Sequence, residues 1–111
     1  MDRLKELSTR RKKAHTRLLQ LKSKTYAAFL EMERAAYSDG ALPRKAKELI
    51  AVGISVVIDC QSCMQWHIEQ AAAQGATRQE VLEAVEVGME MGGGPVSARF
   101  ALEVMDQLFK D

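Results

Sequence analysis

Hydrophobic residues recur along the chain at intervals of three and four positions, the spacing of one face of an α-helix. Over residues 2–36 they alternate with runs of charged residues, and a bend near Ser23 is expected to divide this segment into two helices. The first stripe comprises Leu4, Leu7, Ala14, Leu18 and Leu21, and the second comprises Tyr26, Phe29, Leu30, Met32 and Ala36. The first stripe is narrow, with Arg11 in one of its places. Such a seam suits packing against another subunit or lying across the protein surface.

Residues 45–58 are apolar on nearly every side towards the end of the segment, which is therefore predicted to be the buried central helix. Ser38-Asp39-Gly40 is a turn before it. Pro43 suits the first helical position, because an N–H group there would have no partner within the helix. Taken by themselves, residues 56–58 are also compatible with a strand.

Three more helices are expected in the rest of the chain. The first contains both cysteines and ends at Gly75, and Thr77-Arg78-Gln79-Glu80 is a capping box for the second. Gly92-Gly93-Gly94-Pro95 ends the second helix. The third runs over residues 96–109, with Phe100, Ala101, Val104, Met105 and Leu108 facing inward. The pattern therefore predicts an all-α, single-domain bundle of about five or six helices.

The chain has 111 residues, enough for one hydrophobic core but not for two. Its net charge of +1 is unevenly distributed. Up to residue 25 there are nine basic and two acidic side chains, a balance of +7, and the remainder holds seven and thirteen, a balance of −6. We do not expect nucleic-acid binding, because the basic residues are not interleaved with aromatic ones and the total charge is near zero.

The longest apolar run, residues 50–58, is about half the length that spans a bilayer. No apolar segment follows the basic residues of the N-terminus, as it would in a secretory signal. We therefore expect no membrane association and a cytoplasmic location, where a CxxC motif is more often catalytic than structural.

The reactive site is expected near Cys60, Cys63 and His67, because these residues are both cysteines and one of the two histidines of the chain. On a helix these side chains lie within an arc of about 60°. Asp59 is predicted to be the N-cap, which would place the cysteines where the helix dipole favours a thiolate. Two cysteines one turn apart can form a disulfide. His67 follows Cys63 at the four-residue spacing that would let it take the thiol proton.

Two other interpretations of this cluster stay open. Cysteine is often buried, and a stripe of Cys, Met and Ala at helical spacing also occurs in ordinary cores. A zinc site would need a fourth ligand, for which only the distant His15 or a carboxylate is available. Redox chemistry is the favoured interpretation, and neither a metal nor a cofactor is expected.

Glu48 is the acidic residue of the predicted central helix. If that helix and the cysteine helix are antiparallel and turn near Asp59, Glu48 lies opposite about residue 70, roughly 4.5 Å along the axis from His67. Glu48 would then orient His67 towards Cys63. The alternative is an exposed first-turn carboxylate that complements the helix dipole, and spacing alone does not decide between them.

Glu48, eleven intervening residues and Cys60-x-x-Cys63-x-x-x-His67 resemble the active-site pattern of the AhpD-like alkylhydroperoxidases within the carboxymuconolactone decarboxylase family. The similarity extends to Asp39-Gly40-Ala41-Leu42-Pro43, to the Ala-x-x-x-Gly-Ala-Thr sequence after the histidine and to the Met-Gly-Gly-Gly-Pro sequence beyond it. It covers about residues 26–109. We therefore expect an AhpD-like helical domain over residues 26–111 and a basic helical extension over residues 1–25.

The resemblance implies an all-α homo-oligomer, commonly a trimer or hexamer. It also implies a thiol peroxidase or disulfide reductase that takes a hydroperoxide as substrate and an unidentified dithiol as reductant. Cys63 would attack the peroxide, Cys60 would resolve the sulfenic acid, and Glu48 and His67 would relay protons. Better-studied members carry a second histidine immediately before the second cysteine, where this chain has Ser62.

Two alternative functions remain. A lyase or isomerase acting on a small carboxylic acid is one, although the namesake decarboxylases lack this cysteine pair. The other is a non-catalytic helical assembly module in which the cysteines serve only for packing.

Overall fold

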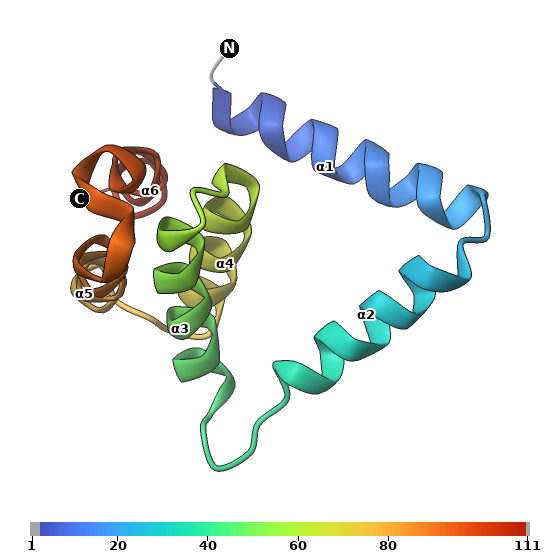
Figure 1. Ribbon diagram of the computed structural model, residues 1–111, viewed down its shortest axis with the longest axis horizontal. Coiled ribbons are helices and arrows are strands. Elements are labelled where there is room, and N and C mark those ends of the chain that lie inside the picture. Colours follow the sequence, from blue (N-terminus) through green and yellow to red (C-terminus); the bar gives the residue numbers. More distant parts are fainter. Residues whose placement is uncertain (1–2, 111) are drawn as a thin grey trace.

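The computed structural model describes residues 3–110, and the secondary structure of this part of the chain is entirely helical (Figure 1). Its elements are α1 (Arg3–Gln20), α2 (Lys24–Ala36), α3 (Arg44–Val57), α4 (Gln61–Ala73), α5 (Arg78–Gly88), the π-helical turn η1 (Met89–Gly93) and α6 (Gly94–Leu108). The predicted all-α class is therefore confirmed. Residues 56–58 complete α3 and its turn and are not a strand, while residue 2 lies outside the described part. No helix of residues 3–110 is long and apolar enough to cross a membrane.

Helices α3 to α6 form the body of the molecule. Helix α3 packs against α4 and α5, and α6 packs against the same two helices (Figure 1). The core contains one buried face of each of these helices and consists mainly of Val52, Val56, Met64, Ile68, Ala71, Val81, Val85, Phe100, Ala101, Val104 and Met105. Gly88 lies so close to Gly53 that a Cβ atom there would overlap the Gly53 carbonyl group. Helices α3 and α5 therefore touch backbone to backbone.

Helices α1 and α2 form a V that stands away from this body (Figure 1). The start of α1 lies against α4, and a loop leads from the end of α2 back to α3. The bend lies where the sequence predicts it, because Ser23 caps α2 by accepting a hydrogen bond from the Tyr26 N–H. Leu4 and Leu7 pack against the core, and the Gln65 side chain donates to the Leu4 carbonyl oxygen at 2.8 Å. The first half of the predicted seam is thus covered within the same chain.

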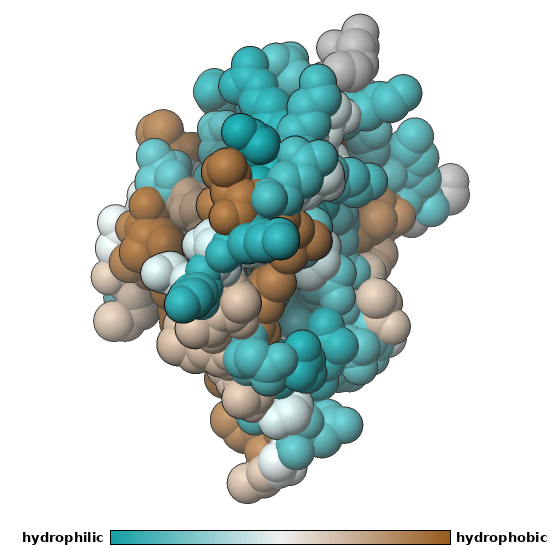
Figure 2. Space-filling model, turned by 90° about the vertical axis from the view of Figure 1, so that its right-hand side faces the viewer, coloured by the Kyte–Doolittle hydropathy of each residue, from teal (hydrophilic) through white to brown (hydrophobic). Residues whose placement is uncertain are grey.

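The far half of the V is more exposed. Leu21 at its corner retains 58% of its accessible surface. Figure 2 views the molecule from this side and shows hydrophobic surface on the left and in the middle, with hydrophilic surface above. The second half of the seam is therefore open in the single chain.

Two expectations about burial are wrong. Helix α3 is not buried all round, because Ile50, Ile54 and Val57 are exposed. Leu108, predicted to face inward, is exposed at the end of α6. The exposed residues of α3 line a groove of about 560 Å³ together with Val87 and Met91. We call this surface the α3–α5 groove.

Candidate functional site

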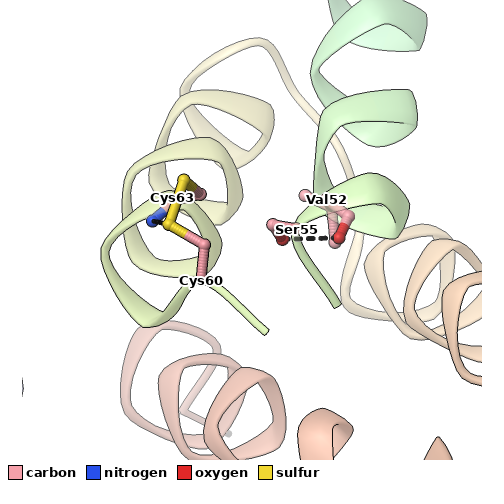
Figure 3. Close-up of a disulfide and its surroundings, with 4 residues drawn as sticks. All are labelled: Val52, Ser55, Cys60 and Cys63. Carbon is pink, nitrogen blue, oxygen red and sulfur yellow. Dashed lines mark hydrogen bonds between the residues drawn. A yellow bond between two sulfur atoms is a disulfide. The ribbon is translucent and has the colours of Figure 1, made fainter. Parts of the chain in front are cut away.

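The junction between α3 and α4 fixes the backbone of the CxxC motif. Asp59 has a φ of 52°, in the left-handed region, and its N–H donates to the Val56 carbonyl at 3.2 Å. The Cys60 N–H donates to the Ser55 carbonyl at 3.0 Å. These two bonds form a Schellman motif that ends α3. The Ser55 hydroxyl, which is buried, donates to the Val52 carbonyl at 2.6 Å (Figure 3).

The prediction that Asp59 caps α4 is wrong. Cys60 is the N-cap, and its Sγ accepts a hydrogen bond from the Cys63 N–H at 3.2 Å. Asp59 is used one step earlier, because aspartate tolerates the left-handed conformation that the end of α3 requires. Cys60 therefore takes part in both caps. Its N–H donates one of the hydrogen bonds that end α3, and its Sγ accepts the hydrogen bond that caps the start of α4.

Cys60 and Cys63 form a disulfide at the start of α4 (Figure 3). Their Cα atoms are 5.2 Å apart, within the usual range for a disulfide. The expectation that the two thiols are close enough to pair is confirmed. The structure is that of the oxidised protein.

Glu48 of α3 and His67 of α4 form a hydrogen-bonded pair, and His67 follows Cys63 by four residues on α4. Glu48 is 1% exposed, and its Oε1 is 2.7 Å from Nδ1 of the His67 ring, whose side chain is 13% exposed. An ionised carboxylate only accepts hydrogen bonds, so Nδ1 carries the proton and donates. The other ring nitrogen, Nε2, is then left to accept a proton. The predicted proximity of the two residues is correct, and the alternative of an exposed first-turn carboxylate is wrong.

Sequence reasoning missed two residues that surround this pair. Arg44 Nε donates to the second oxygen of Glu48 at 3.3 Å, and its terminal NH2 donates to the Gln70 side-chain oxygen at 3.0 Å. Arg44 precedes Glu48 by four residues, so its role could have been found from the helical spacing. Its charge compensates for the burial of the carboxylate, which is costly without a partner.

Tyr37 is the second missed residue. It follows α2, and its ring stacks on the His67 imidazole with centroids 5.2 Å apart. Burial, and next the Glu48 and Glu33 carboxylates, raise the pKa of the Tyr37 phenol above its usual value. The phenol is therefore neutral at physiological pH and covers one face of the imidazole. No local sequence pattern indicates this contact.

A cleft of about 690 Å³ opens beside Cys63 and His67, between α4 and the V of α1 and α2. It is lined by Ser62, Cys63, Trp66 and His67 of α4, by Arg11, Lys12, His15 and Thr16 of α1, and by Tyr26, Phe29, Leu30 and Glu33 of α2. We call it the α1–α2–α4 cleft. Ser62 lines the same space. Cys63 rather than Cys60 is the cysteine that lines the cleft.

The histidine considered as a fourth zinc ligand has another partner. His15 Nδ1 pairs with the Tyr26 hydroxyl near the corner of the V. Within residues 3–110, no three His, Cys, Asp or Glu side chains are gathered in a way that could hold a metal ion. The arrangement as a whole suits reversible thiol chemistry: a cysteine pair, an oriented imidazole and a cleft that admits a reactant.

Sequence comparisons identify several similar proteins. The sequence profile of the carboxymuconolactone decarboxylase family matches residues 23–107. Uncharacterized protein 4 in the cox locus of Paracoccus denitrificans is 37% identical over 83 residues, which are 73% of this chain and 75% of that protein. An uncharacterized protein of Cupriavidus necator is 42% identical over 84 residues, 74% of each chain.

Crystal structures share the fold. That of a carboxymuconolactone decarboxylase family protein from Legionella pneumophila is 30% identical with a TM-score of 0.84, over 96% of this chain and 94% of the other. That of a family member from Thermotoga maritima, suggested to be involved in the antioxidative response, is 23% identical with a TM-score of 0.79, over 93% and 89%. The second likeness concerns the fold alone.

Proposed function

The chain belongs to the carboxymuconolactone decarboxylase family, and from this premise we propose that it is a thiol-dependent peroxidase that cycles between a Cys60–Cys63 dithiol and disulfide. The observation that carries the proposal is the disulfide at the start of α4, next to the buried Glu48–His67 pair. Neither a lyase nor a scaffold needs a Cys60–Cys63 disulfide that opens and closes reversibly. Family membership and a CxxC disulfide are both compatible with an antioxidant role.

In the first step of the proposed reaction, the Cys63 thiol gives its proton to Nε2 of His67. The thiolate then attacks the terminal oxygen of the hydroperoxide, and the O–O bond breaks. Cys63 becomes a sulfenic acid, and the departing alkoxide takes the proton from His67 and leaves as an alcohol. Glu48 holds Nδ1–H, so that Nε2 is the nitrogen that exchanges the proton, and its charge stabilises the imidazolium.

In the second step, the Cys60 thiol attacks the Cys63 sulfur, the disulfide forms and water leaves. A dithiol reductant then restores both thiols and is itself oxidised to a disulfide. Attack on Cys63 from the cleft expels Cys60 as a thiolate, and the Cys63 N–H that bonds Cys60 Sγ stabilises that leaving group. The N-cap position of Cys60 therefore suits the resolving cysteine.

The test is a titration of free thiols under anaerobic conditions. The reduced protein should show two free thiols, and one equivalent of hydroperoxide should remove both and release one equivalent of alcohol. A dithiol should restore them. Retention of both thiols after a prolonged excess of hydrogen peroxide and cumene hydroperoxide would exclude the peroxidase.

We also propose that the chain forms a homo-oligomer, for which a trimer or hexamer is the expectation. The α3–α5 groove supports this, since Ile54 is 54% exposed among other apolar side chains. An apolar surface of this kind marks an interaction site on a protein. Light scattering at micromolar concentration should give a mass several times the 12.4 kDa of one chain.

A pair of variants tests where the copies meet. Ile54→Glu places a charge in the α3–α5 groove and should shift the mass towards the monomer. Val96→Glu adds the same charge at an exposed apolar position of α6 and should leave the mass unchanged. A monomer mass for the parent protein would refute the oligomer. Equal oligomer masses for the parent and Ile54→Glu would show that the interface lies outside the α3–α5 groove.

A further inference from the structure

We propose that the α1–α2–α4 cleft selects hydroperoxides that carry an apolar chain and an anionic end group, with Arg11 and Lys12 of α1 binding the anion. This inference rests on the proposed peroxidase activity and specifies its substrate class, a carboxylate-bearing hydroperoxide. It also gives a role to the basic N-terminal helix, which precedes the residues that match the family profile.

The position of the cleft supports the proposal. Cys63 and His67 lie on its α4 wall, so a molecule bound there reaches the reacting groups. Its volume of about 690 Å³ falls within the range of small-molecule sites. Neighbouring lining residues, Tyr26, Phe29, Leu30 and Trp66, offer aromatic and aliphatic surface to a hydrocarbon chain. A small, fully polar peroxide would leave that surface in water.

The charges of the cleft are contributed mainly by α1. Its lining includes Arg11, Lys12 and His15 from that helix, against one carboxylate, Glu33, on α2. Glu33 lies in the last turn of α2, near Tyr37, whose pKa its charge helps to raise. The α1 side is therefore the cationic end of an otherwise apolar cleft.

Arg11 shows how this cationic end is built. Its guanidinium lies over the Trp66 ring, 4.5 Å from the centroid, which holds it at the cleft wall. One terminal nitrogen donates to Ser8 at 3.5 Å, while Nε is buried and has no hydrogen-bond partner among the described residues. A buried donor without an acceptor costs free energy. A carboxylate arriving from the cleft would pair with the Arg11 guanidinium and with the exposed Lys12 next to it in the sequence.

An internal acid competes for the same cations. Burial raises the pKa of the Glu69 carboxyl on α4. The charges of Arg11 and Lys12 lower that pKa, but by less than burial raises it. Glu69 lines a separate groove, together with Leu4, Ser8 and Gln65, rather than the α1–α2–α4 cleft. The two cations therefore remain available to a ligand in the cleft.

The end group takes no part in the reaction itself. Cys63 breaks the O–O bond and becomes the sulfenic acid, and the product leaves as the corresponding hydroxy acid. The disulfide and its dithiol reductant complete the cycle as proposed above. The charged end changes only the affinity for the substrate. It should therefore alter KM and kcat/KM and leave kcat unchanged.

The kinetic test compares linoleic acid hydroperoxide with its methyl ester, both below their aggregation concentrations. The parent protein should prefer the acid by about tenfold in kcat/KM, the scale of one charge-assisted hydrogen bond. Arg11→Gln/Lys12→Gln should bring the ratio of acid to ester to within about twofold. Lys12→Gln alone keeps the Arg11–Trp66 contact and should lower the ratio partway. Lys13→Gln, an exposed residue of the same helix outside this cleft, is the matched control and should keep the parent ratio.

A second measurement does not depend on turnover. Trp66 is the single tryptophan of the chain and lines the cleft, so its fluorescence reports what binds there. Decanoate should change the emission of the oxidised protein at concentrations at which decanol does not. Lys12→Gln should weaken the response to decanoate, whereas Lys13→Gln should leave it unchanged.

The outcomes separate the two proposals. Equal kcat/KM for acid and ester, with hydrogen peroxide still reduced, would overturn the inference and leave the peroxidase standing. Selective binding of decanoate without oxidation of the thiols by any peroxide would support the anion site and overturn the peroxidase. No fluorescence response to either decanoate or decanol, as when a second copy of the chain fills the cleft, would overturn the inference.

Discussion

Replacing Cys63 by serine should reduce the peroxide-dependent oxidation of the protein to background, whereas Cys60→Ser should still be oxidised once. The reason is position. Cys63 lines the α1–α2–α4 cleft together with His67, while Cys60 Sγ is held at the helix cap by the Cys63 N–H. A serine hydroxyl at residue 63 has no accessible anionic form at neutral pH and does not replace the thiolate nucleophile.

Trapping the sulfenic acid provides the measurement. After one equivalent of peroxide, a dimedone-type reagent should label residue 63 in Cys60→Ser, and mass spectrometry should find no labelled cysteine in Cys63→Ser. The opposite result has a physical basis as well, because the N-cap amide bond favours a thiolate on Cys60. Labelling of Cys60 in Cys63→Ser alone would therefore exchange the two roles and make the cap, rather than His67, the activating feature.

The helices were largely predictable from the sequence because their ends carry strong local signals. Thr77 and Glu80 form the predicted capping box, and Gly75, with a φ of 90°, ends the cysteine helix. The bend at Ser23 is also where the pattern places it. Such signals act over four residues and do not depend on the rest of the fold.

The cap of the cysteine helix was predicted one residue too early for a related reason. Aspartate is favoured both at an N-cap and in the left-handed position that ends a helix, and the sequence does not distinguish the two uses. Here the α3–α4 connection is so short that the residue ending one helix directly precedes the residue that caps the next. Asp59 serves the first purpose and Cys60 the second.

The pairing of Glu48 with His67 was partly predictable, since an antiparallel helix pair with a tight turn fixes the register. The contact with Tyr37 was not, because it depends on the path of residues 37–43, which no periodic pattern describes. The cleft was unpredictable for the same reason. A narrow stripe on residues 4–21 indicates a packing surface, but only the direction of the chain after Ser23 makes α1 and α2 enclose the space beside Cys63.

Replacing Glu48 by glutamine should slow the oxidation of the thiols by peroxide about 10²-fold, the usual scale for losing a positioned acid–base group. The amide oxygen of glutamine still accepts the His67 Nδ1–H, so the ring keeps its orientation. The charge that stabilises the imidazolium is lost, and so is the carboxylate that Arg44 compensates. The reductant-free rate of Cys60–Cys63 disulfide formation should therefore fall while the disulfide itself still forms.

The measurement is this rate between pH 5 and 9, a range that includes the ordinary titration of histidine and cysteine side chains. Glu33→Gln is the matched control, because Glu33 also lines the cleft and also raises the pKa of Tyr37 but lies on α2. It should retain the parent rate within about threefold, a difference of less than 1 kcal/mol in activation free energy. The thermal unfolding temperature of each variant distinguishes the loss of the proton relay from the loss of the fold, because only the latter lowers that temperature strongly. A Glu48→Gln profile that superimposes on the parent would remove Glu48 from the mechanism and leave His67 and the helix cap to activate the thiol.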